Sequence, residues 1–383
     1  MGMTDSSRDR ASPPAAGVVA ESDSAVSERL LRYLQSAMQE PALAYAETPR
    51  RMTGGFEAAI FGFRLGVAPP LFAGPLVLRL FQASRHPQAV RREAAVQNAL
   101  AGMAYPAARV VVIETEPTIL GGPFLVMEKL PGRLLGFGFE GLGEGRSAIV
   151  LVRSLLGLPR HVRRTIRLWC EAQLALHALP AAAFATALEA AGQARNDFSV
   201  DASLAMMRQW TADARLDGLA PGLDWLLTQR PAAVPPVVCH GDLHPFNILV
   251  VEDRITGVID WGGVAIADPA VDLGSVLAIT ATVPIAVPRP LRPIFRALLR
   301  SLGRAFVRAY RRSRPVDGLS LRYFQVYCCL RQLIWVGLGA AAGNPRVGAY
   351  GSPGGVRNLV AHIRAVAGVA VELPVFPGKG KAG

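Results

Sequence analysis

The stretch "HGDLHPFNIL", residues 240–249, places two histidines, an aspartate and an asparagine directly before an apolar run. A structural connector rarely needs so many polar side chains beside a strand, whereas a site that handles phosphate does. Asp242 and Asn247 are followed by Asp260 at the end of the next apolar run, in "GVIDWGG". Mg²⁺ prefers hard oxygen ligands and usually takes one or two protein carboxylates beside substrate phosphates. Asn247 and Asp260 suit that role, and Asp242 suits the acceptance of a proton from an attacking hydroxyl.

A third motif, "ADPAVDL", follows at residues 267–273. In order and spacing, the three motifs resemble the aminoglycoside phosphotransferase family, whose members share a bilobal protein-kinase-like fold. The resemblance spans roughly residues 45–280 and is strongest over 238–274. The alternative is a turn-rich, helix-capping connector, which Asp, Asn and His also favour. Three ordered motifs favour the phosphate site over that alternative.

The resemblance implies a role for each polar residue of these motifs. Asp242 would be the catalytic base, and Asn247 and Asp260 would hold Mg²⁺. Three further residues would brace the catalytic loop by hydrogen bonds: His240, Asp268 and Asp272. The chain departs from the family pattern at Phe246, where a smaller residue is common, and at Gly262–Gly263, where an acid often follows the tryptophan.

The N-terminal part of the chain predicts a small antiparallel sheet that carries one helix. An amphipathic helix is expected first, over 27–38. After it we expect two strands in a hairpin over 49–66, a third strand over 74–81 and a helix over 86–103. Two more strands are expected within 108–116 and 121–132.

Beyond residue 133, helical patterns dominate, over 147–156, 160–178, 201–214, 290–312, 319–340 and 356–370. Between them, 235–263 predicts a loop followed by two short strands. We therefore expect an α+β, bilobal protein-kinase-like fold, with a small antiparallel sheet lobe and a larger, mainly helical lobe. The predicted parts are a disordered tail 1–25, a nucleotide-binding lobe 26–130, a catalytic and acceptor-binding lobe 131–373 and a tail 374–383.

The sheet lobe offers candidates for nucleotide binding. Gly54 and Gly55 stand in the first hairpin turn, where backbone amides could meet phosphate, although a plain turn is the commoner meaning of such a pair. Arg79 is a lone charge on an apolar strand, and an ion pair with Glu93 would explain it; the alternative is an edge strand facing solvent. By resemblance alone, the adenine would meet backbone groups of the linker between the lobes, at Met127, Glu128 and Leu130.

Composition bears on the partner. The formal net charge is +12, and nearly all of the positive charge is arginine, which suits phosphate and carboxylate. Arginines recur every four residues from Arg292 to Arg312, in a predicted amphipathic helix. This stripe argues against a polycationic acceptor and favours a neutral, lipophilic or anionic alcohol, although a solvated helix face is its more common meaning. No groove-reading motif points to nucleic acid.

Four cysteines, none at metal-ligand spacing, fit a reduced, cytoplasmic protein. The N-terminal residues have no apolar core with a cleavage site, so no signal peptide is expected. The uncharged stretch 273–288 is too short for a membrane span of ~20 residues, so no transmembrane segment is expected.

Three functional hypotheses follow. The first is an ATP- or GTP-dependent phosphotransferase that uses Mg²⁺ and an alcohol group of a small molecule as acceptor. The second is a catalytically silent kinase-fold binding protein, which the presence of Asp242, Asn247 and Asp260 disfavours. The third is a peripheral binder of anionic surfaces that uses the arginine stripe of 289–314.

Overall fold

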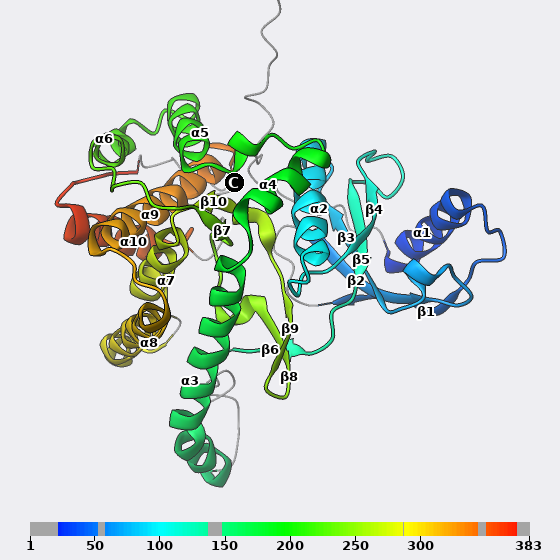
Figure 1. Cartoon of the computed structure of the whole chain (residues 1–383), viewed down its shortest axis with the longest axis horizontal. Helices are drawn as coiled ribbons and strands as arrows, with labels where there is room; N and C mark the ends of the chain where they lie inside the picture. The colour runs from blue at the N-terminus through cyan, green and yellow to red at the C-terminus, as the bar shows by residue number, and fades with distance from the viewer. Residues whose placement is uncertain (1–21, 53–57, 137–147, 286, 344–349, 374–383) are drawn as a thin grey trace, which may run out of the picture.

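The computed structural model describes residues 22–52, 58–136, 148–285, 287–343 and 350–373. Figure 1 shows two lobes side by side. The smaller one contains a sheet together with α1 and α2, and the larger one is mainly helical. The predicted α+β fold with two unequal lobes is therefore confirmed. The boundary that we predicted at residues 130/131 stays a prediction.

The sheet lobe consists of α1 (Asp23–Met38), α2 (Pro87–Gly102) and five antiparallel strands in the order β1-β2-β3-β5-β4. The element order predicted from the sequence is confirmed. The strands are β1 (Tyr45–Met52), β2 (Ala58–Leu65), β3 (Leu76–Phe81), β4 (Val110–Glu114) and β5 (Phe124–Glu128). Buried side chains alternate along β2 and β3, because one strand presents its residues to the two faces of the sheet in turn.

The two helices of this lobe cover the sheet from different sides. Val26, Leu30 and Leu34 recur at helical spacing on α1 and belong to one apolar cluster of the sheet. Val90 and Ala94 of α2 belong to another cluster. The next apolar positions of α2, Val96 and Leu100, join the core of the helical lobe. The helix α2 therefore packs against both lobes and fixes the position of the sheet relative to the helical lobe.

The first helix begins earlier than predicted. It begins at Asp23 rather than residue 27, because the Ser22 side chain accepts a hydrogen bond from the Ala25 amide at 3.3 Å and caps the helix. Residues 23–25 therefore belong to a helix and not to the predicted tail. Residues 1–21 of that tail and the tail 374–383 lie outside the described residues.

The helical lobe contains α3 (Ala148–His177), α4 (Ala181–Ala190), α5 (Val200–Asp213), α6 (Ala220–Thr228), α7 (Ala270–Thr282), α8 (Arg292–Ser313), α9 (Gly318–Ala341) and α10 (Pro353–Ala367). The break predicted between two helices near Pro159 is wrong, because α3 continues through that proline. A proline removes one backbone hydrogen bond, and the bonds on either side can still hold a long helix together. The sequence also missed α4, α6 and α7; eleven of the residues of α7 are buried, so it shows no amphipathic pattern.

Two small sheets position the polar loop of 240–247. The predicted strands β8 (Ile248–Val251) and β9 (Arg254–Val258) pair with β6 (Arg133–Leu134), which follows the linker. Two strands that we did not predict, β7 (Val237–Cys239) and β10 (Ala265–Ala267), pair with each other. Short 3-10 turns complete the described elements: η2 (Pro70–Phe72), η3 (Arg195–Phe198), η4 (Asp217–Leu219), η5 (Pro245–Asn247), η6 (Trp261–Gly263) and η7 (Arg289–Leu291). No helix in the described ranges is both long and apolar enough to cross a membrane.

Candidate active site

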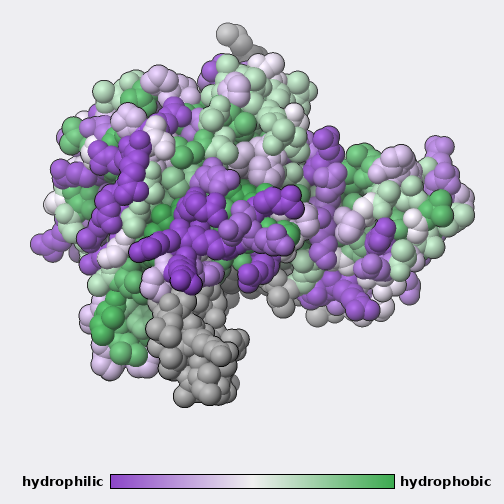
Figure 2. All heavy atoms as spheres, turned by 60° about the horizontal axis from the view of Figure 1, so that its bottom comes forward, coloured by the Kyte–Doolittle hydropathy of each residue, from purple (hydrophilic) through white to green (hydrophobic). Residues whose placement is uncertain are grey.

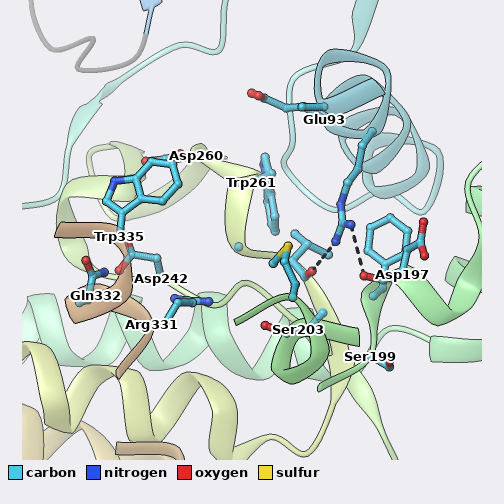
Figure 3. A pocket seen from close by; sticks show the side chains of 18 of the residues that line it. Glu93, Asp197, Ser199, Ser203, Asp242, Asp260, Trp261, Arg331, Gln332 and Trp335 are labelled. Carbon is cyan, nitrogen blue, oxygen red and sulfur yellow. Dashed lines mark hydrogen bonds between the residues drawn. The ribbon is translucent and has the colours of Figure 1, made fainter. Parts of the chain in front are cut away.

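A cavity of about 330 Å³ brings together residues of both lobes (Figure 3). Four residues singled out in the sequence line it, namely Arg79, Glu93, Asp242 and Asp260. The remaining walls come from α2, η3, α5, η6 and α9, elements that lie far apart in the sequence. Arg79, Glu93, Asp242 and Asp260 therefore meet at one partly open cavity.

Asp242 lies in the loop between β7 and η5. Its side chain is 38% exposed, and its Oδ2 lies 3.9 Å from Nε2 of His244. Burial raises the pKa of Asp242, and the charge of Asp260 acts in the same direction, while His244, His240 and Arg331 oppose the rise. A carboxylate with a raised pKa is a better proton acceptor, so the site favours Asp242 as a base.

The local fold places Asn247 beside Asp260. Nδ2 of Asn247 donates to the backbone oxygen of Asp242 at 3.0 Å, and the Ile259 amide donates to the backbone oxygen of Asn247 at 3.0 Å. Asp260 follows in the left-handed conformation, with φ of 69° and ψ of 65°. Such strain is uncommon outside glycine and occurs often at functional sites. This backbone conformation sets Asp260 at the cavity wall.

The donor set fits a divalent cation. Asp242 and Asp260 line one cavity, and the charge of Asp260 contributes to the raised pKa of Asp242. Among the described residues, Asp260 forms no ion pair, and no hydrogen bond uses Oδ1 of Asn247. The Asp260 carboxylate and the Asn247 amide oxygen are ligands of the type that Mg²⁺ takes, although Asn247 is buried and is not among the residues that line the cavity.

Asp272 anchors the backbone of the polar loop of 240–247. Its side chain is fully buried, and it accepts hydrogen bonds from the amides of His240 at 3.0 Å and Gly241 at 2.6 Å. His240 in turn accepts a bond from the Asp242 amide through Nδ1 at 3.3 Å. Asp268 instead accepts a bond from the Ala270 amide at 2.7 Å, at the start of α7. Asp272 and His240 thus contact the loop, whereas Asp268 caps a helix beside it.

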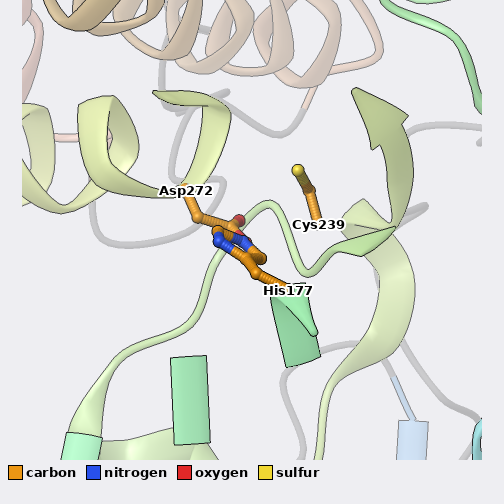
Figure 4. A group of neighbouring side chains, drawn as sticks. All are labelled: His177, Cys239 and Asp272. Carbon is orange, nitrogen blue, oxygen red and sulfur yellow. The ribbon is translucent and has the colours of Figure 1, made fainter. Parts of the chain in front are cut away.

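His177, Cys239 and Asp272 lie close enough together to suggest a buried metal site (Figure 4). The hydrogen bonds argue against that function. His177 uses both ring nitrogens, with Asp272 at 2.9 Å and with the Tyr310 hydroxyl at 2.7 Å. Burial raises the pKa of Cys239 well above its ordinary value, so the thiol stays protonated. The cluster is therefore a hydrogen-bonded support for the loop.

Gly241 is required by close backbone packing. Its φ is +81°, and a Cβ at this position would lie 2.2 Å from the carbonyl oxygen of Gly263. The polar loop of 240–247 and the turn after Asp260 are therefore in contact through their main chains, which only glycine permits. A Cβ at Gly262, by contrast, would meet no atom within 4 Å. Position 262 therefore has room for a side chain, although the chain has glycine here instead of the acid that often follows the tryptophan in the family pattern.

Arg79 forms the predicted ion pair with Glu93. The strand β3 that carries Arg79 lies between β2 and β5, so the alternative of a solvent-facing edge strand is excluded. The Glu93 side chain is 4% exposed and that of Arg79 is 18% exposed. The pair therefore places a fixed cation at the cavity wall, where a polyphosphate could reach it.

The remaining nucleotide predictions have less support. Gly54 and Gly55 lie outside the described residues. Met127, Glu128 and Leu130 are not among the lining residues of the cavity. The Glu128 amide already donates to the Arg109 carbonyl at 2.9 Å. Recognition of adenine by the linker therefore stays a prediction, and the Glu128 amide is not free to take part.

The sequence analysis missed Arg331 and Arg92, which also line the cavity. Arg331 projects from α9 and donates to the Gly241 carbonyl at 2.9 Å. Arg92 donates to the carbonyl oxygens of Asp197 at 3.2 Å and Val264 at 3.5 Å. A lone charge within the apolar run "CCLRQLIWV" was the signal for Arg331, by the same argument that identified Arg79.

The side of the cavity that faces α5 and α9 is rich in aromatic groups. Trp210 and Trp335 have ring centroids 6.4 Å apart, and Met206, Tyr327 and Gln332 lie beside them. Figure 3 shows Trp335, Gln332 and Arg331 on the same side as Asp242. The arginines of α8 do not line this cavity. The arginine stripe therefore gives no information on the charge of the acceptor, and our use of it for that purpose is wrong, because α8 does not reach this cavity.

Comparison with known proteins identifies related sequences and folds. Residues 71–315 match the model of the phosphotransferase enzyme family. A thermostable mutant of aminoglycoside phosphotransferase APH(4)-Ia, in apo form, is 18% identical with a TM-score of 0.56, over 88% of this chain and 100% of that one.

Two ligand-bound structures are also similar. A ternary complex of a thermostable mutant of APH(4)-Ia with ADP and hygromycin B is 16% identical with a TM-score of 0.53, over 89% of this chain and 99% of that one. The GDP and kanamycin complex of APH(2")-IIia is 17% identical with a TM-score of 0.50, over 88% and 98%. At such identities the likeness establishes the fold alone, which is the protein-kinase-like fold expected from the motifs.

Proposed function

This chain belongs to the phosphotransferase enzyme family, and from that premise we propose that it transfers the γ-phosphate of ATP or GTP to an alcohol group of a small molecule. One observation carries the proposal. Asp242, Asp260 and the guanidinium of Arg79 line one cavity, although they come from three separate elements. That combination supplies a base, a cation ligand and a phosphate-binding cation in one space.

Asp242 would orient the acceptor hydroxyl and accept its proton as the oxygen attacks phosphorus. Its raised pKa supports this role, and the loop that holds it is fixed by Asp272 and Gly241. The leaving nucleoside diphosphate departs on the opposite side of the transferred phosphoryl group. Because phosphoryl transfer depends chiefly on placement and charge, this rigidity matters as much as the base itself.

Arg79 would contact the nucleotide phosphates, held in place by Glu93. Asn247 and Asp260 would hold Mg²⁺, with the remaining ligands from the phosphates. The ion would supply neutralisation of the charge on the β- and γ-phosphate oxygens. Arg331 would add positive charge near Asp242, where the transferred phosphoryl group becomes bound.

For the acceptor we propose a neutral, lipophilic or anionic molecule rather than a polycation. The support is the wall formed by α5 and α9, where Trp210, Trp335 and Met206 offer apolar surface and Arg331 offers a cation. Planar apolar groups pack well between aromatic side chains. An acceptor with several ammonium groups would instead lose its hydration in the cavity and be repelled by the positive charges of Arg331 and Arg92.

The silent binding protein remains the alternative, and one assay series separates it from the enzyme. Thermal shifts would be measured with ATP–Mg, GTP–Mg and Mg²⁺ alone, for the parent chain, Asp260→Ala and the exposed control Asp217→Ala. A ligand at a hundredfold excess over its dissociation constant stabilises the folded state by about 2.7 kcal/mol. We expect a magnesium-dependent shift that Asp260→Ala loses and Asp217→Ala keeps.

Turnover is then tested with hydroxylated lipophilic and anionic compounds, by release of nucleoside diphosphate. Asp242→Asn is expected to retain the nucleotide shift and to lower kcat by about 10²–10⁴-fold, the range of general-base catalysis. Binding without transfer in the parent chain would favour the silent protein. The absence of any nucleotide shift would refute the kinase mechanism. We also propose a cytoplasmic location, which the four buried free thiols suit.

A further inference from the structure

A second hollow lies on the other side of the helical lobe, between α3 and α8. It is an open groove of about 640 Å³ with no lining residue in common with the cavity described above. Its floor includes apolar side chains such as Ile166 and Leu174. Four arginines line it, namely Arg163, Arg167, Arg308 and Arg312. The groove therefore combines an apolar base with a strongly basic rim.

The basic charge of α8 is not compensated locally. Its sequence, "RPIFRALLRSLGRAFVRAYRRS", contains no acid. Arg304, Arg308 and Arg312 form no ion pair with any described residue, and all three are exposed. On α3, Arg167 is paired with Glu171 at 3.5 Å and with Asp253 at 3.3 Å. Most of the positive charge of this face thus comes from α8 and remains available to an external anion.

Large apolar side chains are exposed at the beginning of the same helix. Leu291 is 43% exposed, Ile294 is 65% exposed and Leu298 is 36% exposed. Ile294 and Arg312 are separated by five turns of 3.6 residues, so they face the same direction. In Figure 2, which views the molecule from this side, hydrophilic side chains gather in a band and a hydrophobic area borders it.

A solvated arginine face needs no exposed isoleucine, and a nucleic-acid surface does not need one either. An anionic bilayer accommodates both kinds of side chain, because its phosphates attract arginine and its interface buries apolar groups. We propose that the face formed by α3 and α8 docks the protein on an anionic lipid surface. Ile294 and Leu298 insert at the interface, and Arg304, Arg308 and Arg312 contact the headgroup phosphates.

The charge part of the proposal is tested by co-sedimentation with phosphatidylcholine vesicles that contain about 30% phosphatidylglycerol. Loss of one basic residue near such a surface weakens binding about fivefold, so Arg304→Glu with Arg308→Glu should weaken it at least about 25-fold. The matched control, Arg32→Glu with Arg208→Glu, makes the same charge change on α1 and α5. It should weaken binding less than about fivefold.

The apolar part separates a membrane from any other polyanion. Ile294→Ser with Leu298→Ser should weaken vesicle binding by about 10-fold and leave heparin binding unchanged. Unchanged vesicle binding by this variant would overturn the proposal in favour of a general polyanion surface. Equal binding to pure phosphatidylcholine, or equal loss in the charge control, would also overturn it. Vesicle binding is measured without nucleotide, so its failure is independent of the proposed activity.

Discussion

Replacing Asp272 by asparagine tests whether the catalytic loop depends on one buried carboxylate. Oδ1 of Asp272 accepts from the Gly241 amide, while Oδ2 accepts from the amide of His240 and from the side chains of Gln173 and His177. Burial alone would raise the pKa of Asp272, but the hydrogen bonds from His177 and the Gly241 amide, together with the charges of His177 and His240, outweigh it and leave the pKa lowered. The carboxylate is therefore ionised and accepts all four bonds.

An asparagine keeps the shape and loses one acceptor. In its better orientation, the amide oxygen replaces Oδ2 and the NH₂ group faces the N–H of Gly241, donor against donor. Hydrogen bonds to a charged group contribute about 1.5–3 kcal/mol each, so we expect Asp272→Asn to lower the free energy of unfolding by about 2–4 kcal/mol. With an unfolding entropy of about 2.1 cal/mol/K per residue over 383 residues, the Tm falls by about 2.5–5 °C.

The loop should also lose its alignment. Displacement of a reacting group by about 1 Å can cost roughly 10²-fold in rate, so we expect kcat to fall by about 10–100-fold while nucleotide still binds. Differential scanning calorimetry and single-turnover assays measure the two effects, with the exposed Asp224→Asn as control. A Tm within about 1 °C of the parent together with an unchanged kcat would refute the assignment of Asp272 as the anchor of the loop.

Three further substitutions follow from the structure. Burial lowers the pKa of His362 to about 4, so unfolding takes up a proton at pH values between about 4 and 6.5. The free energy of unfolding of the parent chain should therefore fall by up to about 3 kcal/mol as the pH falls through that window. The variant His362→Gln should not show this loss, as measured by urea unfolding at a series of pH values. Gly241→Ala should lower kcat by at least about 10-fold, because its Cβ would collide with Gly263; full activity in initial-rate assays would contradict this. Arg79→Lys should keep charge opposite Glu93 and preserve stability, but weaken nucleotide binding by about 5–10-fold in calorimetric titration, since lysine cannot form a bidentate contact; equal affinity would argue against a phosphate contact.

Local chemistry made part of this site predictable from the sequence. Asp242, Asn247 and Asp260 lie within one short segment, so a spacing rule could place them without knowledge of the fold. Arg79 was identified because a charge on an apolar strand requires a partner, and Glu93 stood at a suitable distance in the next helix. In each case the decisive interaction is close in sequence or is forced by burial.

Residues whose position depends on packing could not be predicted in the same way. The lone charge of Arg331 in an apolar run indicates a buried partner, but no local pattern identifies that partner as the Gly241 carbonyl, some ninety positions earlier. Trp210 and Trp335 form one wall only because α5 and α9 pack together. The helix α7 was missed because burial on all sides removes its periodicity. The arginine stripe was recognised correctly as a helix face, but its direction relative to the cavity is a tertiary property.

The arginines of α8 lie outside the cavity that contains Arg79, and this affects how nucleotide binding must be measured. Arg79 is paired with Glu93, whereas Arg304 and Arg308 have no ion pair within the described ranges and can bind any nucleotide weakly. Such binding needs no magnesium and declines steeply with salt, because exposed charges are screened within about 10 Å at 0.1 M. By the proposed mechanism, nucleotide binding in the cavity would require Asp260 and would be less sensitive to salt. A nucleotide shift that Asp260→Ala removes, and that the Arg304→Glu, Arg308→Glu variant keeps, therefore reports the cavity alone.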